Sequence, residues 1–233
     1  MSRLQGGVLP LLLTGIVALA VGVLAYNKFS PALGGLQSGN DAQARQQESA
    51  QLTALQENLQ TSLALPLDFR QVSDFQLLDQ NGAPLDKSVF ENRWSIVFFG
   101  YTHCPDVCPI TLQTMKNVVE MLKEQNEPEP QVVFVSVDPS RDTSEIMKNY
   151  ISYFNEDFLG ITGDQNEMHK FTRSLGIVAS FTANDEEPEN YIVDHTASLL
   201  VIDPKLRVRA KMSPPHEAET ILADYLTIIA APS

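Results

Sequence analysis

The feature that most constrains this chain is the stretch of residues 95–109, where a continuous apolar run leads into the only two cysteines, Cys104 and Cys108. Residues 95–99 predict a strand that is buried on both faces, because such a strand needs no alternation of polar side chains. Residues 110–123 then carry apolar side chains at helical spacing. The cysteines are therefore expected where a buried strand passes into a helix.

Both cysteines directly precede a proline, Pro105 and Pro109. A proline disfavours the α conformation in the residue before it, and it suits the first position of a helix. We therefore expect both cysteines to be non-helical, with Cys104 at the strand exit and Cys108 at the helix N-cap. A thiolate at a helix N-terminus is stabilised by the dipole and by free N–H groups. Such a pair can close a disulfide or offer two soft sulfur ligands to a soft metal ion.

The charge of the chain excludes some partners. The 233 residues carry a formal net charge of −13. Residues 1–64 hold three basic and three acidic residues, so the remaining 13 basic and 26 acidic residues carry the whole excess. This argues against nucleic acid as a partner, because phosphate binding needs a basic surface. It suits a domain that meets cations or basic protein faces, and it equally suits plain solubility.

The N-terminal part predicts a membrane anchor at residues 1–29. Residues 8–26 are uncharged and strongly apolar, and nineteen such residues are long enough to span a bilayer as a helix. Arg3 before this segment weakly favours an N-terminus on the cytoplasmic side. The alternative is a cleaved signal peptide, for which residues 18–20, Ala-Leu-Ala, offer a cleavage site.

Residues 30–65 predict a linker, and residues 66–233 predict the globular domain. The linker opens with a glycine- and serine-rich joint at residues 30–39. Its second half carries leucines at helical spacing, which predict a partly helical spacer; the alternative is a short helix packed on the domain, on the membrane or on a second copy. These leucines are Leu52, Leu55, Leu59 and Leu63.

The order of elements in the domain predicts an α/β fold. Strand and helix patterns alternate and are followed by a hairpin and a closing helix, which is typical of a central mixed sheet with flanking helices, as in a thioredoxin-like fold. The predicted strands are residues 68–79, 95–99, 131–137, 158–162, 191–193, 197–202 and 207–212. The predicted helices are residues 110–123, 143–154 (capped by Thr143 or Asp142), a helix that follows a turn at residues 163–164 and runs to residue 175, and residues 217–229.

Asp138 is a further candidate because it follows the strand predicted at residues 131–137. In open α/β sheets, binding sites gather at the carboxyl ends of the strands. If this strand is parallel to residues 95–99, Asp138 emerges at the same edge as Cys104. It can then hold a ligand imidazole or balance the charge of a metal site. The alternatives are a helix cap or an ion-pair partner of Arg141.

Three of the four histidines, His103, His169 and His216, are interpreted as surface residues. His195 differs because strand-like residues flank it on both sides. From the residues alone, the usual interpretation of such a single histidine is structural.

Three motifs together resemble the Sco/SenC family. They are GYTHCPDVCP at residues 100–109, VSVDPSRDT at 135–143 and VDHT at 193–196. The resemblance extends from Pro66 to the C-terminus. Two small departures are Thr196, where serine is common, and a turn after residues 203–204 that lacks the usual glycine. The family comprises membrane-anchored copper proteins of thioredoxin fold that help to assemble the binuclear copper site of cytochrome c oxidase.

The resemblance implies that His195 is a third ligand beside Cys104 and Cys108, and the place of Asp138 at the end of its strand makes it the candidate outer partner. Two thiolates and one imidazole suit Cu(I) and, with added ligands, Cu(II). Zinc in a structural site prefers a fourth protein ligand. The implied role is that of a metallochaperone.

The implied partners are the copper-containing subunit of cytochrome c oxidase, other copper chaperones or thiol–disulfide reductants, and the membrane. The implied location is the inner (cytoplasmic) membrane, with a single span and the soluble domain in the periplasm. The alternative function is a membrane-anchored thiol–disulfide reductase that uses Cys104 and Cys108 as a catalytic redox pair. A peroxidase on the same fold is disfavoured, because no lone attacking cysteine is present.

Overall fold

The computed structural model describes residues 41–182 and 191–232. The chain divides into two compact units, Met1–Ala50 and Gln51–Ser233, and the second contains the strands and the folded core described below. The predicted membrane anchor at residues 1–29 lies outside the described residues. Among the residues that are described, no helix combines the length and the apolar character needed to cross a bilayer.

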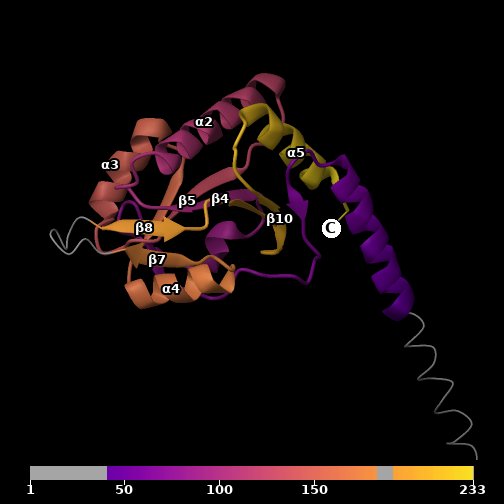
Figure 1. Cartoon of the computed structure of the whole chain (residues 1–233), viewed down its shortest axis with the longest axis horizontal. Helices are drawn as coiled ribbons and strands as arrows, with labels where there is room; N and C mark the ends of the chain where they lie inside the picture. The colour runs from indigo at the N-terminus through magenta and orange to yellow at the C-terminus, as the bar shows by residue number, and fades with distance from the viewer. Residues whose placement is uncertain (1–40, 183–190, 233) are drawn as a thin grey trace, which may run out of the picture. The chain divides into compact units, whose positions relative to one another are not determined.

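Within the described residues, the centre of the fold is a mixed eight-stranded sheet in the order β1-β10-β9-β4-β5-β6-β2-β3. Strands β4, β5 and β10 of this sheet are labelled in Figure 1. Strands β4, β5 and β6 are parallel, and β9 runs antiparallel to β4. A separate two-stranded sheet pairs β7 (Ala179–Thr182) with β8 (Ile192–His195). The strands of the main sheet are β1 (Leu63–Ala64), β2 (Leu77–Asp79), β3 (Pro84–Leu85), β4 (Ser95–Gly100), β5 (Gln131–Ser136), β6 (Leu159–Thr162), β9 (Leu199–Ile202) and β10 (Val208–Met212).

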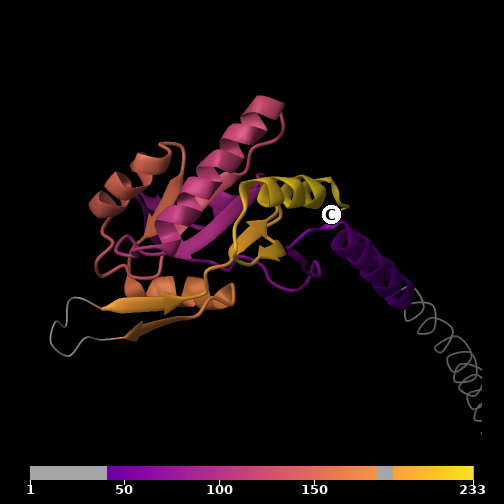
Figure 2. The same ribbon diagram turned by 45° about the horizontal axis from the view of Figure 1, so that its top comes forward.

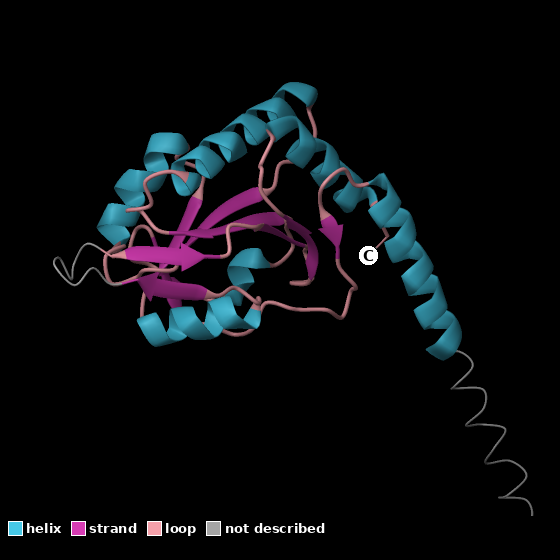
Figure 3. Ribbon diagram, viewed as in Figure 1, coloured by secondary structure: helices cyan, strands magenta, loops and turns pink. Residues whose placement is uncertain are grey.

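Helices cover both faces of the sheet, because the side chains of the central strands alternate between two apolar clusters. Ile96 and Phe98 pack into the cluster that contains α2, α3 and α5, whereas Val97 and Phe99 pack into the cluster that contains α4 and the 3-10 helix η1. Figures 2 and 3 show α4 on the side of the sheet opposite α2 and α5. The helices are α2 (Val107–Gln125), α3 (Ser144–Phe154), α4 (Gln165–Ser174), α5 (Ala218–Ala230) and η1 (Lys87–Phe90). The predicted mixed α/β sheet with flanking helices is confirmed.

The strand predicted at residues 68–79 is mostly wrong, because only Leu77–Asp79 joins the sheet. The residues before it are joined to the segment before β10 by an isolated β-bridge between Gln71 and Arg207 and by a hydrogen bond from the backbone N–H of Val72 to the carbonyl oxygen of Leu206. Val72 and Phe75 are nevertheless buried in the core. Their apolar pattern therefore reflects packing rather than strand pairing.

The folded unit takes in residues that the sequence assigned to the linker. Residues 41–58 are helical, and Leu55 is buried in the core cluster with α2 and α5, with Leu52 and Leu59 partly buried beside it. Strand β1 then pairs with β10. The fourth leucine of the pattern, Leu63, stays 54% exposed. The leucine spacing thus marks a helix that packs on the domain through Leu52 and Leu55, with Leu59 directly after its end.

Asp224 of α5 fixes the turn that joins this helix to β1. Its buried carboxylate accepts hydrogen bonds from the backbone N–H groups of Gln60, Thr61 and Ser62 and from the Ser62 hydroxyl, at 2.6 to 3.1 Å. Burial raises the pKa of Asp224, but the hydrogen bonds from Gln60, Ser62 and Thr61 outweigh this effect, so the pKa lies below its ordinary value. Folding therefore stabilises the ionised form of Asp224.

Asp224→Ala should lower the free energy of unfolding by about 3 kcal/mol at pH 7, because it leaves these N–H groups without their charged acceptor. A carboxyl whose pKa falls on folding stabilises the fold above its unfolded pKa, and this contribution is lost as the pH falls through the folded pKa. The difference between wild type and variant should therefore shrink below about pH 4. Urea unfolding of wild type and variant, at pH 7 and below about pH 4, measures this difference in the free energy of unfolding. Glu219→Ala, an exposed change on the same helix, is the control. An equal loss in both variants would contradict the assignment.

Candidate metal centre

The loop between β4 and α2 carries the two cysteines, but the helix begins earlier than the sequence predicts. Helix α2 starts at Val107 with Asp106 as its N-cap, so Cys108 lies inside the first turn. The predicted N-cap position and non-helical conformation of Cys108 are therefore wrong. The reason is that Pro109 is only the third helical residue, where the missing N–H has no intrahelical partner to lose. Cys104 lies in the loop before the helix, as predicted.

Gly100 allows the sulfur of Cys108 to lie against the end of β4. A Cβ atom at this position would stand 2.7 Å from the Cys108 sulfur and 2.7 Å from Cε2 of Phe134. Both neighbours are fully buried, so neither can yield easily. The glycine in the motif is thus required by close packing and brings the thiol into contact with the sheet.

The two cysteines are free thiols with different environments. The hydrogen bond from the Cys108 thiol is the main cause that lowers the pKa of Cys104 to about 5; burial opposes this shift, and backbone N–H groups of Asp106 and Cys108 support it. The same hydrogen bond and burial raise the pKa of Cys108. The partly exposed Cys104 is therefore the thiolate, and the buried Cys108 keeps the shared proton.

His195 reaches the pair from the end of β8. Its Nε2 atom lies 3.8 Å from the Cys108 sulfur, and its Nδ1 atom lies 3.2 Å from the carbonyl oxygen of Thr196. Since a carbonyl oxygen only accepts, this contact favours the proton on Nδ1 and leaves Nε2 as the free lone pair. The rings of Tyr101 and Phe98 meet the imidazole edge-on, with centroids 6.0 and 6.3 Å away.

The separation of Cys108 and His195 fits a shared metal ion. Bonds of about 2.3 Å to sulfur and about 2.0 Å to imidazole nitrogen, as in zinc sites, reach both atoms across a 3.8 Å gap. No group of three or more His, Cys, Asp or Glu side chains among the described residues is already arranged to hold a metal. The structure therefore brings Cys108 together with Cys104 and with His195 as two pairs, and a metal bound to all three requires a local adjustment.

Asp138 lies at the predicted edge of the sheet, two residues after the end of β5. Its carboxylate is buried and binds Nε of Arg141 and the hydroxyl of Tyr191, the latter at 2.7 Å. The pairing with Arg141 was one of the alternatives that the sequence left open. Burial and, after it, the hydrogen bond to the Asp138 carboxylate raise the pKa of Tyr191 to about 12, so this hydroxyl remains a donor.

Asp142, which the sequence offered only as a helix cap, supports the loop that carries the cysteines. Its buried carboxylate accepts hydrogen bonds from the backbone N–H and hydroxyl of Thr102 and from the hydroxyl of Ser136. Its carbonyl oxygen accepts from Thr162 on β6. Burial raises the pKa of Asp142. The sequence feature that could have indicated this role is the position of Asp142 in the segment that follows a buried strand, four residues after Asp138.

The other histidines take no part in this centre. His103 and His169 are exposed, as predicted. His216 is partly buried and its Nε2 lies 2.9 Å from the carbonyl oxygen of Ala197, so the predicted surface position is only partly correct. Burial lowers its pKa.

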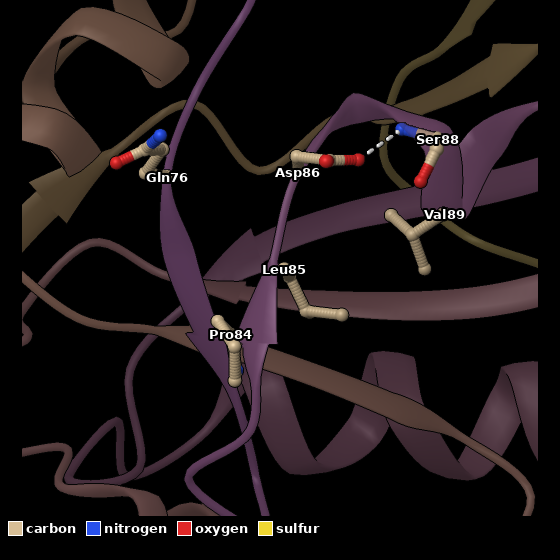
Figure 4. A pocket seen from close by; sticks show the side chains of 6 residues that line it. All are labelled: Gln76, Pro84, Leu85, Asp86, Ser88 and Val89. Carbon is tan, nitrogen blue, oxygen red and sulfur yellow. Dashed lines mark hydrogen bonds between the residues drawn. The ribbon is translucent and has the colours of Figure 1, made fainter.

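A pocket of about 560 Å³ lies elsewhere, beside β2, β3 and η1 (Figure 4). Its only charged lining residue, Asp86, already accepts a hydrogen bond from the backbone of Ser88 as the N-cap of η1. None of the predicted site residues lines it. The lining residues are Gln76, Pro84, Leu85, Asp86, Ser88 and Val89.

Comparison with known proteins gives one consistent family. The family model described as SCO1/SenC matches residues 66–230. An SCO2-like protein of Rickettsia prowazekii is 36% identical over 129 residues, which cover 55% of this chain and 62% of that protein. The structure of Bradyrhizobium japonicum ScoI with copper bound has a TM-score of 0.59 and 35% identity, and the match covers 66% of this chain and 96% of that one. Arabidopsis thaliana ScoI with copper bound has a TM-score of 0.63 and 27% identity, with 67% and 96% covered.

Alkylation should distinguish the two thiols. At pH 6.5 and without metal, iodoacetamide should modify Cys104 before Cys108, because Cys104 is the accessible thiolate with a pKa of about 5. The rate should fall as the pH is lowered through that pKa. Peptide mass spectrometry measures the order, with Cys108→Ala as the comparison: removing the donor should raise the pKa of Cys104 and slow its reaction at pH 6.5. First modification at Cys108 would contradict the assignment.

Proposed function

Because the chain belongs to the SCO1/SenC family, we propose that it binds copper through Cys104, Cys108 and His195 and serves the binuclear copper site of cytochrome c oxidase, either by delivering copper or by preparing its thiols. The observation that carries this proposal is the position of the Cys108 sulfur, which contacts both Cys104 and Nε2 of His195. Cys104 comes from the same loop as Cys108, whereas His195 lies 87 residues further along the chain, and both side chains contact the Cys108 sulfur.

The donor set suits copper in the lower oxidation state. Two thiolates and one imidazole form a soft site of low coordination number, which favours Cu(I) and, with an added ligand, Cu(II). Cys104 is already the thiolate, whereas Cys108 must release its proton to solvent before its sulfur can bind. The Thr196 carbonyl keeps Nε2 of His195 free to act as the third donor.

A second function, thiol–disulfide reduction, is favoured by the asymmetry of the cysteine pair. The accessible Cys104 thiolate attacks one sulfur of a partner disulfide, forms a mixed disulfide and releases the first partner thiolate. Cys108 then loses its proton and attacks the Cys104 sulfur, which releases the second partner thiolate. The partner gains two electrons and Cys104–Cys108 becomes a disulfide. This reaction does not require His195 as a ligand.

The proposed partners are the copper-containing subunit of cytochrome c oxidase, and other copper chaperones or thiol–disulfide reductants. We place the domain in the periplasm, anchored by residues 1–29 to the inner membrane. The support is the uncharged run at residues 8–26. Full-length chain that resists carbonate extraction from membranes is the expected result. A soluble product that begins near Tyr26 or earlier would indicate cleavage instead.

His195→Ala should weaken the binding of Cu(I) by more than about 100-fold, because a lost ligand costs more than the outer partners of ligands do. The Cys104–Cys108 disulfide should still form, since Gly100 and α2 position both thiols without the imidazole. Copper affinity by chelator competition and the dithiol reduction potential are measured on the same samples.

His169→Ala, which removes an exposed histidine on α4, is the matched control and should bind copper as wild type does. Unchanged copper affinity in His195→Ala would remove His195 from the site and favour the reductase. Loss of both copper binding and disulfide formation would assign His195 to the fold.

A further inference from the structure

We propose that Tyr191, Arg141 and Asp138 form a latch that holds β8 against the end of β5 and thereby sets the position of His195 relative to Cys108. This inference rests on the proposed copper site, because its consequence is the affinity of that site for metal. The three residues are positioning residues: none of them needs to touch the metal. We refer to them together as the Tyr191 latch.

The latch begins with contacts made by Tyr191 immediately before β8. Its hydroxyl donates to Oδ1 of Asp138 at 2.7 Å, while Nε of Arg141 binds the other carboxylate oxygen. The guanidinium carbon of Arg141 also lies 3.6 Å from the centre of the Tyr191 ring. A hydrogen bond to a buried carboxylate and a close cation–π contact thus act on the same side chain.

The other side of the latch is fixed to the main sheet. Asp138 is 1% exposed, and its backbone N–H donates to the hydroxyl of Ser136, the last residue of β5. The backbone N–H of Arg141 returns to the carbonyl oxygen of Asp138 at 3.2 Å. The carboxylate and the guanidinium therefore stand on a short closed turn at the rigid end of a central strand.

Strand β8 needs such an attachment, because within the described residues it pairs with β7 and not with the eight-stranded sheet (Figures 1 and 2). Alternate residues of a strand share a face, so Tyr191, Val193 and His195 point the same way. Val193 is 3% exposed and packs in the apolar cluster with β5. The latch holds one end of this row, the core holds the middle, and His195 at the other end meets Cys108.

The latch also touches the loop that carries Cys104. The guanidinium carbon of Arg141 lies 5.6 Å from the ring centre of Tyr101, and Tyr101 faces His195 edge-on at 6.0 Å. Arg141 thus lies between an aromatic ring on the hairpin and an aromatic ring on the cysteine loop. Movement of Tyr191 away from Arg141 shifts His195 relative to the loop, while the cysteines keep their own support from Gly100 and Asp142.

Tyr191→Phe tests the latch with the smallest change, because the ring stays and only the hydrogen bond to Asp138 is lost. The expected result is a loss of about 10-fold in Cu(I) affinity, the lower end of what outer partners of metal ligands contribute. The dithiol reduction potential should match that of wild type. Arg141→Lys, which keeps the charge and removes the planar stacking group, should show the same selective loss. Tyr153→Phe is the matched control, since Tyr153 is 80% exposed on α3.

A metal-free readout separates the latch from the copper proposal. In NMR spectra of the reduced apo protein, the ring signals of His195 should shift in Tyr191→Phe and stay unchanged in Tyr153→Phe. If wild type binds no copper while the His195 signals respond to Tyr191→Phe, the copper proposal fails and the positioning by the latch stands. Wild-type copper affinity together with unshifted His195 signals in Tyr191→Phe would overturn the latch. An equal change in affinity and dithiol potential would also overturn it, because it would indicate a general structural role.

Discussion

The close contact between the Cys108 sulfur and the backbone of Gly100 is the constraint on which the rest of the site depends. It exists because β4 is buried on both faces and ends in a residue without a side chain, so that the first turn of α2 can approach the sheet. The hydrogen bond between the two thiols and, after it, the burial of Cys108 raise the pKa of Cys108, and the same hydrogen bond lowers the pKa of the partly exposed Cys104, which is therefore the thiolate. The contact with Gly100 also places this buried sulfur atom 3.8 Å from Nε2 of His195 at the end of β8. The pairing of an accessible thiolate with a buried thiol suits both of the proposed functions, metal binding and disulfide exchange, and only the first of them requires His195.

Two buried carboxylates that follow β5 each hold a different segment of the site in place. Asp142 holds the cysteine loop through Thr102, and Asp138 holds the hairpin through Tyr191. The hydroxyl of Ser136 joins them, because it donates to Asp142 and accepts from the backbone of Asp138. One residue at the end of a central strand thus connects the support of the cysteines with the support of the histidine.

Much of this arrangement could be predicted from the sequence, because its signals are local. The continuous apolar run of β4 and the helical spacing of α2 predicted the strand-to-helix passage that carries both cysteines. The start of α2 was misplaced because the rule for residues before proline yields in the first helical turn, where a proline loses no hydrogen bond. The short strands β1 and β7 were missed, since two to four residues carry no periodic signal and their pairing depends on distant partners. The hydrogen bonds of Asp142 and Tyr191 were also out of reach, because they join segments 40 and 53 residues apart. The choice of His195 came from the family motif, not from its periodicity.

The central claim is that one copper ion binds Cys104, Cys108 and His195 together, and X-ray absorption at the copper K edge tests it most directly. Reduced protein loaded with one equivalent of Cu(I) should show two sulfur ligands and one nitrogen ligand. The nitrogen ligand should disappear in His195→Ala while both sulfur ligands remain. A wild-type spectrum with fewer than two sulfur ligands, or a nitrogen ligand that persists without His195, would contradict the account.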